Sequence, residues 1–460
     1  DYLHWPRVTD ARKAALIDDW IARNPPGSAD AWEPYPVSLR IVNWVKLFLD
    51  PAWHGRVPGP WLASLAAQAA WLEGNLEHHI RANHYLKNAK ALCFAGCFFA
   101  GPAAEGWRRR GLRLLGDQVR EQFLADGAHY ELSPMYHHLC TEDCLDLLQL
   151  AAGDGALAPA QDRALLRDTA RRALAFAAGM TLPDGGLPLF NDSAHGIAPD
   201  AAALLAYGEA VLGERVPAPP TRGPIRFPQA GYYGARDGGD MWLVDCGPVS
   251  PPYQPGHTHC DLLSFELCVG GRRVVVDTGV HDYGLTETRR YARSTAAHNT
   301  VAVQGCEQSE VWGAFRVARR ARPLDARLRE EDDGVTFTGA FLGFPGVAGR
   351  VRHHREVRHR YGVGLEIRDR VTGAPPGSVS ARLHLHPDLC AGEAPGGRVR
   401  VTGPVGEAVL EVVPSGGEHL VIEGGWHFPE FGVRVPNQVV VVHAAGEVPE
   451  EMAYSLRFPA

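Results

Sequence analysis

The sequence predicts an α+β protein of several domains, in which a helical N-terminal half is followed by an antiparallel β-sandwich. From about residue 10 to residue 213, apolar residues recur every three or four positions, which is the period of an amphipathic helix. After residue 228, apolar residues alternate with polar ones or form short β-branched runs between glycine-rich turns. The segment between the halves, residues 216–228, contains five prolines and is typical of a stiff linker.

The helical half is expected to consist of antiparallel helix pairs joined by short loops. In the segment 102–126, for example, Trp107, Leu115 and Val119 belong to one apolar stripe with arginine and glutamate between them. Most of the helical segments end near glycine or proline, where helices commonly stop. The predicted helices cover residues 61–80, 84–100, 102–126, 136–152, 160–180 and 199–213.

The C-terminal half is expected to fold as a sandwich of short antiparallel strands. Strands are predicted at residues 272–279, 363–371, 380–386 and 438–444. The predicted domains are therefore a helical domain over residues 1–215, the linker over 216–228, and a sandwich over 229–460.

Composition limits the class of protein. The chain has 460 residues, of which 45% are hydrophobic and 22% charged, as in soluble proteins of two or three domains. The net charge of -7 argues against a general nucleic-acid binder but leaves an acidic substrate open. No apolar run reaches the length of about 18 residues that a membrane-spanning helix needs. The nine cysteines do not indicate a disulfide framework, and those in the helical half are interpreted as small core residues.

The first residues carry neither a basic nor an apolar signal region. A periplasmic or secreted location is expected if a signal peptide was removed, and a cytoplasmic one if the chain is complete as given. A homodimer is one possible assembly.

Histidines and carboxylates cluster in three separate segments. His257, His259 and Asp261 alternate at the start of a predicted strand, so their side chains are expected on one face. Asp277 ends an apolar strand, and His298 lies in a stretch of small residues. Together, His259, Asp277 and His298 form a ligand set that suits zinc. The alternatives are hydrogen-bonded core histidines, a turn-forming aspartate and a capping histidine.

Six stretches then resemble the heparinase II/III-like polysaccharide lyases, together with their alginate-lyase relatives. The resemblance implies that the helical half is an α/α toroid, an incomplete barrel of helical hairpins, followed by the sandwich. The matching stretches are WEPYPVSLRIVNWVK (32–46), NHYLKNAKALCFAGCFF (83–99), ELSPMYHH (131–138), GHTHCDLLSFEL (256–267), VVDTGVHDYG (275–284) and RYARSTAAHNTV (290–301).

The resemblance also implies a site. Its catalytic residues correspond to Asn83, His84, Tyr136, His257 and Tyr283. The zinc ligands correspond to His259, Asp277 and His298, with the ion supporting the active site rather than touching the substrate.

Members of this family cleave uronic-acid polysaccharides by β-elimination, which removes a weakly acidic proton next to a carboxylate. Asn83, assisted by His84, would stabilise the charge that develops on the carboxylate. Tyr136 would protonate the leaving oxygen, and in a syn elimination it would also remove the proton; otherwise His257 or Tyr283 would be the base. Without the resemblance, Tyr136 reads as a core tyrosine and Asn83 as a helix N-cap.

Residues near these positions are candidates for binding an acidic polysaccharide, because arginine pairs with carboxylate or sulfate groups and tryptophan stacks on sugar rings. The expected substrate is a glycosaminoglycan, alginate or a bacterial exopolysaccharide. Two alternatives are a zinc-dependent hydrolase and a non-catalytic protein of polysaccharide binding or biosynthesis. The candidate substrate-binding residues are Arg81, Asn191, Asp192, Arg293 and Trp312.

Overall fold

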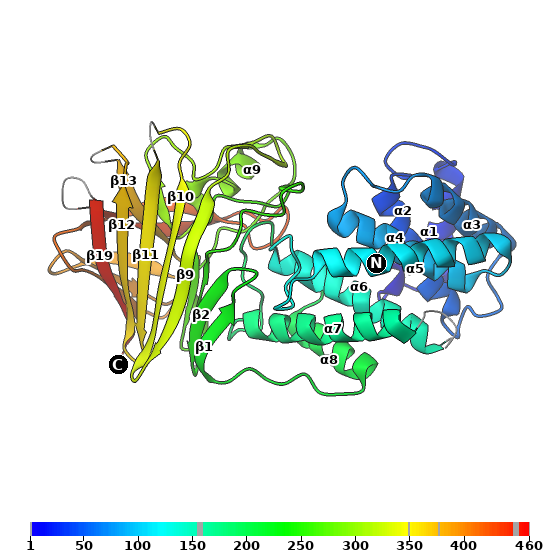
Figure 1. Ribbon diagram of the computed structural model, residues 1–460, viewed down its shortest axis with the longest axis horizontal. Helices are drawn as coiled ribbons and strands as arrows, with labels where there is room; N and C mark the ends of the chain where they lie inside the picture. Colours follow the sequence, from blue (N-terminus) through cyan, green and yellow to red (C-terminus); the bar gives the residue numbers. More distant parts are fainter. Residues whose placement is uncertain (1, 154–159, 348–349, 376–377, 445–449, 460) are drawn as a thin grey trace. The chain divides into compact units, whose positions relative to one another are not determined.

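The computed structural model describes residues 2–153, 160–347, 350–375, 378–444 and 450–459 (Figure 1). The chain separates into two compact units, residues 1–123 with 140–171 and 211–213, and residues 124–139 with 172–210 and 214–460. The helices are η1 (Tyr2–His4), α1 (Asp10–Arg23), α2 (Pro34–Leu49), α3 (Gly59–Gly74), α4 (Ala82–Phe98), α5 (Pro102–Gln122), α6 (Pro134–Gly153), α7 (Ala160–Met180), α8 (Ala201–Leu212), α9 (Glu287–Ala292) and η2 (Thr295–Ala297).

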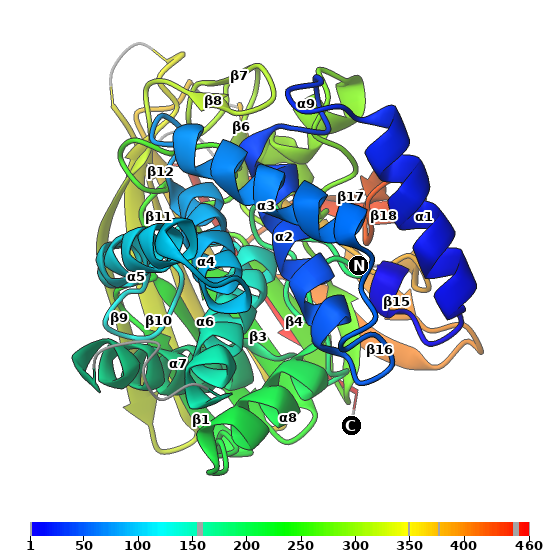
Figure 2. The same ribbon diagram turned by 90° about the vertical axis from the view of Figure 1, so that its right-hand side faces the viewer.

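The first unit is helical, and α2, α3, α4 and α5 lie side by side in it (Figure 2). Two glycines let α4 and α5 approach closely. A Cβ atom on Gly96 would lie 2.5 Å from the backbone nitrogen of Arg108, and one on Gly111 would lie 2.8 Å from that of Cys93. The two pairings run in opposite directions along the helices, so α4 and α5 form an antiparallel pair, as predicted.

The six predicted helices are all present, and the differences lie at their ends. The largest is in α3, which ends at Gly74 and not at residue 80, because Asn75 leaves the helical conformation and caps it. The helices α1 and α2 lie within the region of helical period but were not delimited individually. Cys93, Cys140 and Cys144 are buried, as expected of small core residues, whereas Cys97 is only partly buried.

Charged residues are buried inside the helical unit. Lys87 and Lys90 of α4 each place their Nζ atom 2.7 Å from a carboxylate oxygen of Asp143, and Lys90 also contacts Asp146. Asp146 lies 2.7 Å from Lys46 as well. Burial would raise the pKa of Asp146, but the lysines outweigh it and hold the pKa well below its usual range. Each buried charge is therefore matched by an opposite one, which is the condition for burying it.

The second unit contains three antiparallel sheets and a small hairpin, β7 (Val311–Trp312) with β8 (Arg316–Val317). In spatial order, the five-stranded sheet is β1 (Arg222–Phe227), β2 (Tyr232–Asp237), β3 (Asp240–Asp245), β4 (Phe265–Val269) and β5 (Arg272–Val275). The eight-stranded sheet is β14 (Cys390–Ala394), β15 (Arg398–Thr402), β16 (Ala408–Pro414), β19 (Glu450–Arg457), β12 (Gly364–Thr372), β11 (Val351–Arg360), β10 (Gly334–Gly343) and β9 (Arg322–Glu331). The four-stranded sheet is β17 (His419–His427), β18 (Val435–His443), β13 (Val379–His384) and β6 (Val301–Val303).

One hydrophobic core takes side chains from all three sheets, which makes this unit the predicted sandwich. The five-stranded sheet is buried on both faces. Along β3, Trp242 and Val244 enter the sandwich core, whereas Met241 and Leu243 pack on the opposite face. That opposite face is covered by segments around residues 124–132 and 176–190, and these segments lead directly into the candidate site.

Part of the predicted linker is a strand. Residues 222–227 form β1, which pairs with β2 at the edge of the five-stranded sheet. Pro224 is compatible with this position because an edge strand leaves one row of amides without ladder partners. The domain boundaries at residues 215 and 229 stay a prediction.

Over the described residues, no helix combines the length and apolar character needed to cross a membrane.

A buried ion pair links two strands of the eight-stranded sheet to loops near the site. Asp369 of β12 accepts hydrogen bonds from Arg355 Nε and Nη2 at 2.7 and 2.8 Å and lies 2.7 Å from His353 Nε2. Arg355 also donates to the carbonyl oxygens of Leu263 and Asn299 at 2.6 and 2.7 Å. Burial favours a raised pKa for Asp369, but Arg355 and His353 outweigh it and hold the pKa well below its usual range.

We expect Asp369→Asn to lower the free energy of unfolding of the sandwich by about 3 kcal/mol at pH 7, because it leaves the buried Arg355 charge unpaired. The pKa of Asp369 is lower in the folded than in the unfolded state, so its contribution is complete above the unfolded value of about 3.9 and is lost as pH falls through the folded value. Urea unfolding at pH 7 and at a series of acidic pH values measures both effects. Asp325→Asn, at an exposed position, is the control, and equal stabilities of the two variants at pH 7 would contradict the expectation.

Candidate active site

The site is organised around the carboxylate of Asp192, which is completely buried. Its Oδ2 atom lies 2.9 Å from His257 Nδ1 and its Oδ1 atom 2.8 Å from His259 Nε2. Arg289 of α9 donates to both oxygens, with Nη2 2.9 Å from Oδ2. Burial would raise the pKa of Asp192, but Arg289 and the histidines outweigh it and hold the pKa well below its usual range. Asp192 therefore stays ionised and fixes three cationic or polar side chains.

The loop that carries Asp192 is held by its neighbour Asn191, which adopts a positive φ of 56° that asparagine tolerates better than most residues. The side-chain nitrogen of Asn191 donates to the carbonyl oxygen of Leu132 at 3.1 Å, and its side-chain oxygen accepts from the backbone N–H of His259 at 3.0 Å. The backbone N–H of Asn191 donates to Asp261 at 3.1 Å. Asn191 thus joins three segments of the second unit, and its contacts favour a positioning role over the predicted substrate contact.

The segment that carries His257 and His259 is a loop, and its prediction as the start of a strand was wrong. The strand β4 begins only at Phe265, because the Pro255–Gly256 turn and the positive φ of 61° at Leu263 interrupt the extended backbone. Both histidines nevertheless reach the same carboxylate, one to each oxygen of Asp192.

His257 lies between two carboxylates. Its Nδ1 faces Asp192, and its Nε2 lies 3.1 Å from Oε2 of the buried Glu131. Burial would lower the pKa of His257, but the hydrogen bonds to Asp192 and Glu131 outweigh it and raise the pKa to about 9. The ring is therefore an imidazolium at neutral pH, a form that has no lone pair with which to accept a proton.

Two tyrosines meet beside this imidazolium. Tyr136, in the first turn of α6, places its hydroxyl 3.1 Å from the hydroxyl of Tyr283, and its ring stacks on His257 with the centroids 4.0 Å apart. The Arg289 guanidinium carbon lies 5.1 Å from the Tyr283 ring centroid. Burial raises the pKa of Tyr283 well above its usual value, with the Asp192 carboxylate adding to the effect, so this phenol keeps its proton at neutral pH.

The three predicted zinc ligands lie together. His298 Nδ1 is 2.8 Å from Asp277 Oδ2, and the rings of His259 and His298 are 5.3 Å apart. His259 Nδ1 and His298 Nε2 are buried without a hydrogen-bond partner in the described part of the chain. Burial lowers the pKa of His259 to about 4, so its ring is neutral, as a metal ligand must be. This donor set fits zinc in its chemistry, although no group of three or more such side chains among the described residues is arranged to hold an ion.

The predicted residues of the helical unit are Arg81, Asn83 and His84, at the start of α4. Asn83 is buried and is the second residue of the helix, so it is not the N-cap; Arg81 occupies that position with a positive φ of 64°. His84 Nδ1 lies 2.9 Å from Glu77, and its ring lies 4.3 Å from that of Tyr35. The proposed roles of these residues in catalysis and binding stay predictions.

The other two predicted substrate-binding residues differ in exposure. Arg293 is 1% exposed and donates to the carbonyl oxygens of Thr258, Gly313 and Arg316. It therefore holds loops together, whereas Trp312 at the end of the β7 strand is 59% exposed and available for contact.

The sequence reasoning missed Glu131 and placed Asp192 among the candidate substrate-binding residues. The sequence offered only the positions of these residues as a signal. Glu131 is the first residue of one of the family-like stretches, five residues before Tyr136, and Asp192 follows an asparagine in a loop of small residues. Neither position reveals burial or the partner, because each partner lies more than sixty residues away in sequence.

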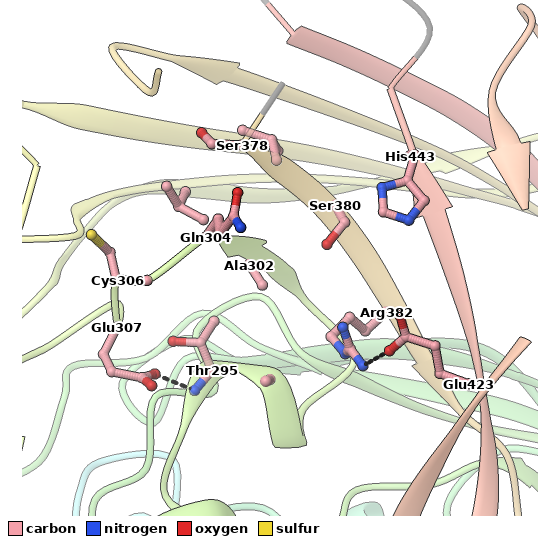
Figure 3. A pocket seen from close by; sticks show the side chains of 14 residues that line it. Thr295, Ala302, Gln304, Cys306, Glu307, Ser378, Ser380, Arg382, Glu423 and His443 are labelled. Carbon is pink, nitrogen blue, oxygen red and sulfur yellow. Dashed lines mark hydrogen bonds and ion pairs between the residues drawn. The ribbon is translucent and has the colours of Figure 1, made fainter. Parts of the chain in front are cut away.

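A cavity of about 440 Å³ opens elsewhere on the second unit, against β6 and β13 (Figure 3). Arg382 and Glu423 pair with each other at 2.6 Å in its lining, and Glu307 accepts from the backbone N–H of Thr295. Its described lining contains none of the predicted catalytic residues, and its charged groups are already paired, so we assign it no catalytic role.

The curated proteins that are similar to this chain include heparin-sulfate lyases. A heparin-sulfate lyase of Pedobacter heparinus is 27% identical over 399 residues, which are 80% of this chain and 57% of the relative. A heparin-sulfate lyase of Bacteroides stercoris is 25% identical over 62% of this chain and 48% of its own length. The chain thus spans about half of the length of the curated relatives that it matches.

Solved structures confirm the predicted fold class, an α/α toroid followed by an antiparallel β-sandwich. The crystal structure of heparinase III has a TM-score of 0.75 with 19% identity, covering 98% of this chain and 74% of its own. A heparan sulfate lyase mutant from Pedobacter heparinus has a TM-score of 0.70 with 22% identity, covering 98% of this chain and 72% of its own. Residues 11–205 match the model of the heparinase II/III N-terminus, and residues 219–455 match that of the heparinase II/III-like C-terminal region. The chain therefore belongs to the heparinase II/III-like family.

Proposed function

We propose that the protein is a polysaccharide lyase that cleaves a uronic-acid polysaccharide by β-elimination. The observation that carries this proposal is the pair of tyrosine hydroxyls 3.1 Å apart beside the His257 imidazolium. The names of the relatives favour a heparan-type glycosaminoglycan as the substrate, ahead of the alginate and exopolysaccharide that the sequence also left open.

β-Elimination breaks the C5–H and C4–O4 bonds of the uronate and forms a C4–C5 double bond. The proton on C5 is only weakly acidic, and its removal transfers negative charge to the adjacent carboxylate. In the proposed mechanism the Asn83 amide, assisted by His84, donates hydrogen bonds to that carboxylate without itself changing protonation state.

Both proton transfers are assigned to Tyr136. Because His257 is already an imidazolium, it is a poor base, and this disfavours the sequence-based alternative in which it removes the C5 proton. Its positive charge instead stabilises negative charge on the Tyr136 oxygen during transfer. As the phenolate that this charge stabilises, Tyr136 would take the C5 proton and then give it to O4 in a syn elimination, which regenerates the phenolate, while the protonated Tyr283 donates a hydrogen bond to Tyr136.

We further propose that His259, Asp277 and His298 hold a zinc ion. The two buried ring nitrogens without partners and the neutral state of His259 support this assignment. Zinc would act as a structural ion here, joining the three segments that carry its ligands. Because His257 and His259 are two residues apart and share Asp192, a fixed His259 also fixes the imidazolium beside Tyr136.

We expect Tyr136→Phe to lower kcat by at least about a hundredfold, the effect typical of losing a general acid–base group. The assay follows the ultraviolet absorbance of unsaturated uronate ends on heparan-type, chondroitin-type, hyaluronan and alginate polymers. Tyr2→Phe, at an exposed position, is the matched control and should keep full activity. Chain shortening without this absorbance would favour the hydrolase, and binding without chain shortening would favour the non-catalytic alternative.

We expect Asp192→Asn to reduce kcat at least tenfold while leaving KM within about threefold, because the carboxylate orients His257 and Arg289 without touching substrate. The same variant should lower the free energy of unfolding by about 3 kcal/mol, since the buried Arg289 charge loses its partner. Steady-state kinetics and urea unfolding measure the two effects, with Asp325→Asn as control. A large rise in KM at unchanged kcat would instead indicate the direct substrate contact predicted from sequence.

We expect the purified protein to bind about one zinc ion per chain, and His298→Ala to abolish this binding. Elemental analysis after dialysis against a trace of zinc gives the stoichiometry independently of activity. His79→Ala removes an exposed histidine and should retain the ion. Equal zinc contents in the wild type and His298→Ala would overturn the assignment.

A further inference from the structure

A second cavity of about 310 Å³ lies between α9 and the end of β17. Thr288 and Tyr291 of α9 line one side, and Gly424, Trp426, Phe428 and Arg434 line the other. No catalytic, metal-binding or substrate-binding residue predicted from the sequence lies in this lining.

Arg434 gives the cavity an oriented positive charge. Its guanidinium carbon lies 3.5 Å from the centroid of the Trp426 ring, and the side chain is exposed. Within the described part of the chain, Arg434 has no carboxylate within ion-pair distance. Stacking fixes the plane of the guanidinium, so its N–H groups along the edge remain suited to a carboxylate or sulfate.

Two glycines shape the cavity. A Cβ atom on Gly425 would lie 2.6 Å from Val439 Cγ2 and 2.7 Å from Asn437 Oδ1, so only glycine fits there without displacing its neighbours. A Cβ atom on Gly424 would meet nothing within 4 Å. The wall at Gly424 therefore borders open space, which a bound group can occupy and an added side chain can fill.

The negative charge in the lining is balanced. Glu287 lines the cavity at the start of α9 but is highly exposed and pairs with Arg290 at 2.5 Å. The Thr288 hydroxyl donates to Asp282, which places it in the hydrogen-bond network at this end of α9. Arg434 is consequently the charged group in the lining that is placed to receive an anion.

The cavity shares two elements with the catalytic cluster. Phe431, in the segment between Phe428 and Arg434, packs against Tyr283 with the ring centroids 4.9 Å apart. On α9, Tyr291 lines the cavity while Arg289, two residues earlier, binds Asp192. Both walls of the cavity, α9 and the segment from Phe428 to Arg434, therefore also contact residues around Asp192 and Tyr283.

We propose that this cavity is a subsite for an acidic sugar unit, whose carboxylate or sulfate binds Arg434. The proposal rests on the proposed function for the class of ligand and extends it by naming where a unit of the polysaccharide binds outside the catalytic cluster. An acidic sugar has an apolar ring face and an anionic group. The aromatic rings and the glycine-lined wall of the cavity complement the ring face, and the Arg434 cation complements the anionic group.

The test is isothermal titration of size-fractionated heparan-sulfate octasaccharide into the full chain carrying Tyr136→Phe, which prevents cleavage. Adding Arg434→Gln should weaken binding about tenfold, the value of one charge-assisted hydrogen-bonding group. Arg400→Gln removes an exposed arginine of β15 and controls for net charge; it should change affinity by less than about twofold. A titration with the unsulfated octasaccharide of the same backbone separates carboxylate from sulfate recognition.

A second pair of variants acts through the wall of the cavity. Gly424→Glu places a carboxylate at the open position and should weaken binding by at least the same factor, whereas Gly424→Ala should leave it unchanged. If Arg434→Gln and Arg400→Gln bind equally well, the subsite is excluded. If binding depends on Arg434 but the wild type cleaves no polymer, the subsite is upheld and the lyase activity is rejected. If the wild type cleaves a polymer but binding does not depend on Arg434, the lyase activity is upheld and the subsite is rejected.

Discussion

The candidate active site depends on one buried carboxylate. Asp192 is surrounded by His257, His259 and Arg289, which come from a loop and from α9. Burying an isolated carboxylate is very costly, and burying the arginine alone would cost as much. The loop and the helix can therefore occupy these positions only together, because each charge repays the desolvation of the other. The Asn191 side chain adds neutral hydrogen bonds that keep the carboxylate's own loop in register.

This arrangement sets the charge of the site before any substrate arrives. With Asp192 and Glu131 on either side, His257 is held as a cation whose ring cannot turn away, since both nitrogens have partners. Tyr136 stacks on that ring, and Tyr283 contacts the Tyr136 hydroxyl. A fixed cation next to a proton-transferring oxygen lowers the energy of the charged state without reorganisation, which is the main source of electrostatic catalysis. In the proposed mechanism the histidine acts through charge and position, Tyr136 transfers the proton, and Tyr283 donates a hydrogen bond to Tyr136.

The sequence predicted the helices and the sandwich because their signals are local, namely a period of three to four residues and a period of two. It failed where distant segments decide the conformation. The alternation around His257 and His259 suggested a strand, yet the loop is held by contacts to Asn191 and Asp192, more than sixty residues earlier. Family resemblance supplied Tyr136 and Tyr283 as candidates. Nothing in the local sequence around Glu131 distinguishes a buried partner of a histidine from a solvated glutamate, and its burial follows only from the packing of its segment on the five-stranded sheet.

The helix α9 contributes residues both to the Asp192 cluster and to the lining of the cavity beside Arg434. Arg289 is oriented toward Asp192, and Tyr291, about 200° farther round the helix, is oriented toward the cavity beside Arg434. A shift of α9 that improved one contact would alter the other, since both side chains move with the same short helix. Any effect that binding at the proposed subsite has on the order of the Asp192 cluster must be matched by an equal effect of that order on binding, because coupling between two sites is reciprocal. The helix α9 therefore links the proposed subsite beside Arg434 to the buried carboxylate that holds His257 and Arg289.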